Sequence, residues 1–349
     1  MKRLTTLLFV TFISLILTHT ATLTAKEPVT FKNIPYVSGG GVRQQLDIML
    51  PDDYKDRTEK LPLVVWIHGG GWTAGSKDNS PNLILVNQGF ATASINYRYA
   101  TEKPFPAQLE DCKSAIRWLR AHANEYNFDT EKVGVWGASA GGHLVALLGT
   151  TGDTKKYDVG ENLDQSSVVQ AICDIYGPTD FVITTKNWGE FHVVREPVLS
   201  LLGGKDASVE IAKGASPLYH VKKNMPPFLI LHGDQDKLVN LDQSVRFEKA
   251  LKDVNVEVEL LVAKDAGHDG FFVTRPDFIK KTVDFFTNHL KRNAKQPDVA
   301  VMVSGDHNKA DTLSQPLLET TKKNSRLKNP RRSKTNKVTV PTRYTPQHR

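Results

Sequence analysis

The pentapeptide GASAG, Gly137 to Gly141, has a serine at its centre. A Gly-x-Ser-x-Gly pattern between a strand and a helix is typical of a sharp turn that holds the serine oxygen above a sheet. The turn strains the backbone of Ser139, and close backbone contacts then require glycine two positions to either side. The following helix points its first N–H groups at developing negative charge. Ser139 is therefore a candidate nucleophile, with a simple glycine-rich turn as the alternative at this point.

A second glycine run, HGGGW from His68 to Trp72, offers backbone hydrogen-bond donors. Because glycine has no side chain, its N–H groups can face a reacting group directly. Acyl transfer needs such donors for the oxyanion of the tetrahedral intermediate, and losing one costs about 3–4 kcal/mol of barrier stabilisation. The run is not a phosphate-binding loop, because Ser76 and Lys77 follow Gly75 in the reverse of the required order.

Two further segments supply a carboxylate and an imidazole. HGDQD ends in Asp236, with Asp234 two residues before it, and KDAGHDGF contains His268. The chain order Ser, Asp, His is that of hydrolases in which a serine, activated by a histidine and an acid, attacks a carbonyl. From the residues alone, either aspartate could be the acid.

The other histidines have more ordinary interpretations. His143 lies one helical turn beyond the candidate serine and is expected to pack beneath the turn, and His68 is expected to shape its own loop. His289 lies on an amphipathic helix, and His307 and His348 lie near the C-terminus. No spacing of His, Cys and acidic residues is typical of a metal site, so the sequence predicts no metal.

Between about residues 29 and 290, strand-like and helix-like segments alternate. This alternation predicts a mainly parallel sheet covered on both faces. The strand-like segments are 42–50, 61–70, 90–98, 132–139, 168–177, 226–233 and 256–263, and the helix-like ones are 106–123, 140–149, 245–251 and 275–290. Because each candidate chemical group directly follows a strand, all of them are expected at the carboxyl edge of the sheet, where ligands bind in such folds.

One long segment interrupts this alternation. Residues 177–226 carry Trp188, Phe191, Arg195 and Tyr219 without a clear period. A long excursion after a strand end predicts an irregular cap over a site.

The two ends of the chain differ in composition from its body. Residues 1–25 have a basic start and a short apolar centre, which predicts a secretory signal peptide and therefore a secreted or periplasmic protein. Residues 291–349 hold 14 Lys and Arg against 4 Asp and Glu, although the whole chain has a net charge of only +7. We expect residues 293–349 to form a basic disordered tail, with a tether to an anionic polymer or surface as the alternative. The tail lacks interleaved aromatic residues, so nucleic-acid binding is not predicted.

The only two cysteines, Cys112 and Cys173, do not form a disulfide framework. Both are expected to be buried free thiols, with a bridge between them as the alternative.

Taken together, HGGGW, GASAGGHLVALLG, FLILHGDQDKLV and AGHDGF resemble the α/β-hydrolase esterases of the hormone-sensitive-lipase and carboxylesterase type. The match is closest to the bacterial group of bifunctional feruloyl and acetyl-xylan esterases, and it covers roughly residues 29–290. The resemblance implies an α/β-hydrolase fold, with a mostly parallel central sheet, helices on both faces and an irregular cap. It implies a catalytic domain over residues 26–292.

Position by position, the resemblance assigns a role to five residues. Ser139 matches the nucleophile and His268 the general base, and the backbone donors of the oxyanion hole match Gly70, Gly71 and Ala140.

The resemblance also separates the two aspartates. In the family pattern His-Gly-x-x-Asp-x-x-Val, the acid position is Asp236, and Asp234 is left as a residue that shapes the turn. The chain departs from the family at Asp269, which separates His268 from Gly270. The carboxylate of Asp269 is a second candidate for steering the protonation of the histidine.

The sequence therefore predicts a secreted serine esterase that works through an acyl-serine intermediate. Its expected substrates are acetyl or feruloyl esters of polysaccharide, or related short-chain esters. The alternatives are a serine peptidase similar to prolyl oligopeptidases and a non-catalytic binding protein of the same fold. Neither a cofactor nor a transmembrane segment is expected.

Overall fold

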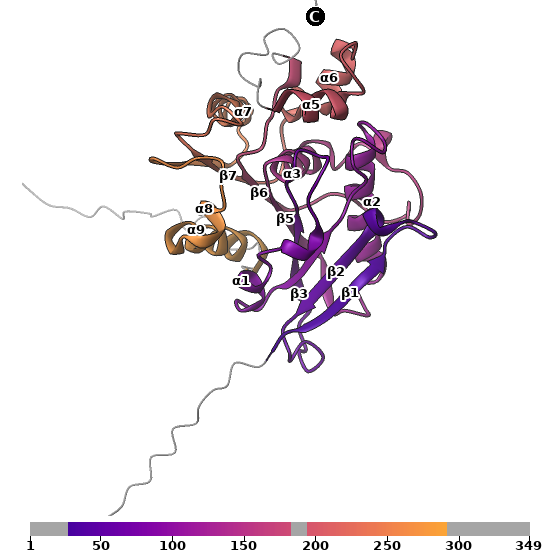
Figure 1. The fold of residues 1–349 in the computed structure, drawn as a ribbon. Coiled ribbons are helices and arrows are strands. Elements are labelled where there is room, and N and C mark those ends of the chain that lie inside the picture. The colour runs from indigo at the N-terminus through magenta and orange to yellow at the C-terminus, as the bar shows by residue number, and fades with distance from the viewer. Residues whose placement is uncertain (1–26, 183–193, 292–349) are drawn as a thin grey trace, which may run out of the picture. The chain divides into compact units, whose positions relative to one another are not determined.

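A single eight-stranded sheet forms the centre of the fold (Figure 1). The computed structural model describes residues 27–182 and 194–291. The strand order is β1-β2-β4-β3-β5-β6-β7-β8. The bounds are β1 Val29–Pro35, β2 Gln45–Leu50, β3 Leu61–Ile67, β4 Ala91–Ile95, β5 Phe128–Ala138, β6 Ala171–Ile175, β7 Phe228–Gly233 and β8 Val258–Ala263.

The sheet is parallel except at one edge. β2 pairs antiparallel with both β1 and β4, and every other neighbouring pair is parallel. The seven residues of β3 are all buried, as expected for a strand covered on both faces, whereas burial alternates along β2. The carboxyl ends of β3, β5, β7 and β8 therefore lie along the same edge, as the sequence predicts.

Helices cover both faces of this sheet, and the predicted α/β-hydrolase architecture is confirmed. One face packs against α2 (Ala107–Ala121), α3 (Ala140–Thr151) and α7 (Asp242–Asp253). The other packs against α1 (Leu83–Val86), α8 (Phe271–Thr274) and α9 (Pro276–Phe286). Cys112 belongs to the first apolar cluster and Cys173 to the second, and both are buried free thiols, as expected.

The segment 177–226 breaks the alternation of strands and helices, and its described part carries short helices separated by turns. It contains α5 (Arg195–Leu202), α6 (Val209–Ala215) and a 3-10 helix (Pro217–His220). Each helix spans about two turns or fewer, which is too short for apolar spacing to give a clear period. α5 nevertheless buries one face through Val198 and Leu201.

Several predictions fall on residues outside the described ranges. These are the signal peptide 1–25, the basic tail 293–349, and Trp188 and Phe191 of the expected cap. Within the ranges that the structure describes, no helix is both long and apolar enough to cross a membrane.

Candidate active site

Ser139 lies in the sharp turn between β5 and α3. Its φ of 58° and ψ of −120° place it in a conformation that non-glycine residues rarely adopt. A Cβ at Gly141 would lie 2.0 Å from the carbonyl oxygen of Ile67, and one at Gly137 would lie 2.7 Å from the same atom. The strained serine and the need for both glycines are therefore confirmed.

Three side chains that lie far apart in the sequence meet above this turn. His268 Nε2 lies 2.8 Å from Ser139 Oγ, and His268 Nδ1 lies 2.7 Å from Asp236 Oδ2. In the tautomer with a proton on Nδ1, the imidazole donates to the carboxylate and accepts from the serine hydroxyl. The structure thus brings together the serine, the histidine and the aspartate that the sequence selects.

The carboxylate of Asp236 is held on several sides. Its side chain is 0% exposed, and Oδ1 accepts hydrogen bonds from the N–H groups of Leu238 (2.8 Å) and Val239 (2.9 Å). His232 Nε2 lies 3.4 Å from Oδ2. Burial alone would raise the pKa of Asp236, but the hydrogen bonds from His232 and His268 hold this pKa well below its usual range. The group is therefore an anion that faces the imidazole.

Two nearby aspartates have other contacts. Oδ1 of Asp234, which is exposed, accepts a hydrogen bond of 2.7 Å from the N–H of Asp265. Oδ1 of Asp269 accepts one of 2.9 Å from the N–H of Phe271 at the start of α8. Both carboxylates therefore shape the backbone of their loops, whereas Asp236 contacts the imidazole of His268.

The glycine run after β3 lies directly beside the serine. A Cβ at Gly69 would lie 3.3 Å from Ser139 Cβ. Gly70 and Gly71 have φ values of +111° and +57°, which favour glycine. Among the described residues, no carbonyl accepts from the N–H of Gly70, Gly71 or Ala140. These three groups can therefore donate to a bound molecule.

Two buried histidines support this glycine run. The Nδ1 of His68 bonds to the carbonyl of Gly69 (2.7 Å), and its ring stacks on Tyr97. His143 accepts a hydrogen bond from the indole N–H of Trp72 (3.0 Å), and its Nε2 bonds to the main-chain carbonyl of Ala215 on α6. Burial lowers the pKa of each histidine to about 4, so both are neutral near pH 7. Neither contacts Ser139 Oγ in the way His268 does.

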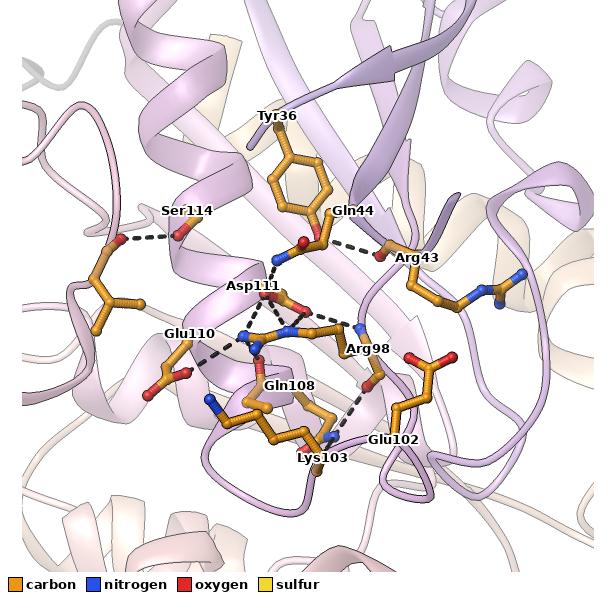
Figure 2. A network of polar contacts seen from close by, with 12 residues as sticks. Tyr36, Arg43, Gln44, Arg98, Glu102, Lys103, Gln108, Glu110, Asp111 and Ser114 are labelled. Carbon is orange, nitrogen blue, oxygen red and sulfur yellow. Dashed lines mark hydrogen bonds and ion pairs between the residues drawn. The ribbon is translucent and has the colours of Figure 1, made fainter. Parts of the chain in front are cut away.

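A polar network holds the loop between β4 and α2 (Figure 2). The guanidinium of Arg98 donates to the carboxylate of Asp111 on α2, with distances of 2.8 to 3.0 Å, and the backbone N–H of Arg98 donates to the same carboxylate at 2.8 Å. Asp111 is almost fully buried, with 1% of the residue exposed.

The residues next to Arg98 hold the glycine run. The hydroxyl of Tyr97 donates to the carbonyl of His68 (3.0 Å), and the N–H of Ala100 donates to the carbonyl of Trp72 (2.8 Å). Sequence reasoning did not select this network, although the motif NYRY, residues 96–99, lies at the end of a predicted strand.

A model of the family named BD-FAE matches residues 46–251. The chain belongs to the BD-FAE family. This membership confirms the resemblance to α/β-hydrolase esterases.

Individual relatives agree with this assignment. Esterase LipC of Mycobacterium tuberculosis is 31% identical to this BD-FAE chain over 74% of the chain and 65% of LipC. A solved carbohydrate esterase from gut microbiota, in truncated form, is 29% identical with a TM-score of 0.69, and the match covers 77% of this chain and 99% of that chain. A bifunctional GH43-CE protein of Bacteroides eggerthii is 31% identical with a TM-score of 0.67, over 75% of this chain and 35% of that one. The chain spans about half to two thirds of the length of the curated relatives it matches.

Proposed function

We propose that this chain is a serine esterase that hydrolyses carboxylic esters through an acyl-serine intermediate. The observation that carries the proposal is the continuous contact from Ser139 Oγ through His268 to Asp236, beside a glycine run whose N–H groups at positions 70 and 71 have no acceptor among the described residues. Names of relatives such as esterase LipC support the same reaction class.

The reaction follows from the positions of these groups. Ser139 Oγ attacks the ester carbonyl while His268 Nε2 takes its proton, and Asp236 stabilises the imidazolium through Nδ1–H. The N–H groups of Gly70, Gly71 and Ala140 donate to the oxyanion of the tetrahedral intermediate. That intermediate collapses as His268 gives the proton to the departing alcohol, which leaves an acyl-serine. Water, deprotonated by His268, then attacks the acyl-serine and releases the acid.

Acetyl or feruloyl esters of polysaccharide, and related short esters, are the proposed substrates. Two of the similar solved structures are described as a carbohydrate esterase and a GH43-CE protein, which supports a carbohydrate substrate.

We further propose that residues 1–25 direct export, because a polymeric ester is met outside the cell. Expression of the full chain, followed by N-terminal sequencing of the exported protein, tests this step: a protein retained inside the cell with residues 1–25 attached would contradict it.

The nucleophile is tested with Ser139→Ala. This variant should lose the burst of nitrophenol from nitrophenyl acetate and should not react with a fluorophosphonate probe. Ser166 is an exposed serine whose Oγ accepts a hydrogen bond from the N–H of Val168, so Ser166→Ala should behave as wild type. Near wild-type turnover by Ser139→Ala would overturn the assignment.

The substrate class is tested with a panel of esters. Acetyl-xylan, methyl ferulate and nitrophenyl esters of increasing chain length should give the highest kcat/KM for a carbohydrate ester or a short acyl group. A preference for long acyl chains, or for peptide bonds, would contradict the proposed substrates.

A further inference from the structure

Tyr176 directly follows β6 and has an unusual backbone conformation. Its φ is +44°, in the left-handed region that a residue with a bulky side chain rarely adopts. Its N–H donates to the carbonyl of Leu231 on β7 (2.8 Å), and only 7% of the residue is exposed. The backbone is therefore held by the sheet in a conformation that aims the side chain in one direction.

The ring of Tyr176 lies against the proposed general base. Its centroid is 4.3 Å from that of His268, with an angle of 48° between the planes, and 5.6 Å from that of Phe272. The imidazole therefore has an apolar ring beside it, in addition to its polar contacts with Ser139 and Asp236.

The hydroxyl of Tyr176 reaches the residue that follows His268. It donates to the main-chain carbonyl of Asp269 at 2.8 Å. Burial, first of all, raises the pKa of Tyr176 well above its ordinary value, so the hydroxyl keeps its proton and remains a donor. Asp269 is the residue that separates His268 from Gly270, and its side chain bonds to Phe271 as well. Asp269 is thus held in place through both its main-chain carbonyl and its carboxylate.

The histidine loop needs such an anchor because of its neighbours. His268 stands between Gly267 and Asp269, and Gly270 follows. A Cβ at Gly270 would meet no atom within 4 Å, and one at Gly267 would meet only the carboxylate of Asp269 at 4.0 Å. Packing at the two glycines therefore does not fix the loop, and glycine gives the backbone wide freedom.

We propose that Tyr176 is a positioning residue for His268, whose ring supports the imidazole and whose hydroxyl fixes the loop through the carbonyl of Asp269. The proposal rests on the proposed function, since it assigns how the general base is held in line with Ser139. Loss of the hydroxyl loosens the loop without removing any group that contacts the substrate, so turnover falls and substrate binding does not.

Tyr176→Phe tests the hydroxyl while it keeps the ring. The kcat for nitrophenyl acetate should fall up to about tenfold, because a tenfold change in rate corresponds to about 1.4 kcal/mol, the upper end of what one net hydrogen bond contributes. KM should stay within about twofold, because no binding group is removed. The matched control is Tyr36→Phe, which removes another buried hydroxyl bond, 2.7 Å long, to the carbonyl of Asn96. This control should lose a similar amount of stability and keep the wild-type kcat.

Hydrogen–deuterium exchange of the peptide 264–275 tests the loop independently of turnover. The amides of this peptide should exchange faster in Tyr176→Phe than in wild type or Tyr36→Phe, because the loop opens more often. A wild type without esterase activity would refute the proposed function, yet the exchange comparison would still test the anchor. Exchange in Tyr176→Phe equal to that in Tyr36→Phe, or an unchanged kcat, would overturn the proposal.

Discussion

The two loops on either side of Ser139 are held in opposite ways. The donor loop, residues 68–75, is held by buried groups from the β4–α2 loop and from α3, whose His143 is in turn bonded to α6. The histidine loop, residues 264–270, follows the edge strand β8 and is held by a few hydrogen bonds, such as those from Tyr176 and to Asp234 and Asp236. A defect on the donor side should therefore lower stability first, and a defect on the histidine side should lower turnover first.

The largest effect is expected for Asp236→Asn on the histidine side. An amide at this position favours the wrong tautomer of His268 and leaves the imidazolium without its counter-charge, and the equivalent change in serine proteases lowers kcat about 10⁴-fold. Steady-state turnover of nitrophenyl acetate measures the loss, with circular dichroism to show that the variant is folded. Full activity would exclude Asp236 as the acid.

On the donor side, Asp111→Asn should act mainly on stability. The buried Asp111 is paired with Arg98, which is 23% exposed at its side chain, and removing one partner of such a pair costs on the order of 3 kcal/mol. Urea unfolding measures this cost, and kcat per folded molecule should stay close to wild type.

The control for that variant is Asp253→Asn, which breaks the exposed pair between Asp253 and Lys249 on α7. Exposed pairs contribute only about 0–1 kcal/mol, so its unfolding curve should barely move. A collapse of kcat in folded Asp111→Asn would contradict the contrast between the two loops.

The donor loop should also make the protein sensitive to acid. The unfolded chain protonates His68 near its ordinary pKa of 6.5, whereas burial lowers the pKa to about 4 in the folded protein. The resulting stability is fully present above pH 6.5 and is lost as pH falls towards 4, with a total of about 3 kcal/mol. Wild type should therefore lose more unfolding free energy between pH 6.5 and pH 4 than His68→Asn. Parallel losses in the two proteins would show that His68 titrates normally.

Much of the fold could be predicted because its signals are local. The fully apolar β3 indicates a strand covered on both faces. The alternation of apolar and polar residues along β2 indicates a strand near the less covered side of the sheet. The helices α5 and α6 could not be predicted, since each is too short for a clear period and depends on packing for its stability.

The candidate site likewise has residues that could be predicted from the sequence and one that could not. Ser139 could be found from its own glycines, and His268 and Asp236 from the strands that precede them. Tyr176 could not, because its partner Asp269 lies 93 residues away and is contacted through a main-chain carbonyl that any residue would provide. Long-range bonds to the backbone leave no pattern in side-chain types.

The smallest effect on turnover is expected for Asp234→Ala, only two residues from Asp236, where the largest effect is expected. Asp234 is exposed, and the hydrogen bond that its carboxylate accepts from the N–H of Asp265 contributes about 1 kcal/mol or less of loop stability. This bond lies at the start of the histidine loop, and the flexible Gly267 separates it from His268. Its loss should therefore change the position of the His268 side chain very little. We expect kcat within about twofold of wild type, a change smaller than one net hydrogen bond gives, measured alongside Asp236→Asn. If Asp234→Ala instead lost as much turnover as Asp236→Asn, the loop would behave as one rigid unit, and its anchors would matter as much as the contacts of His268 itself.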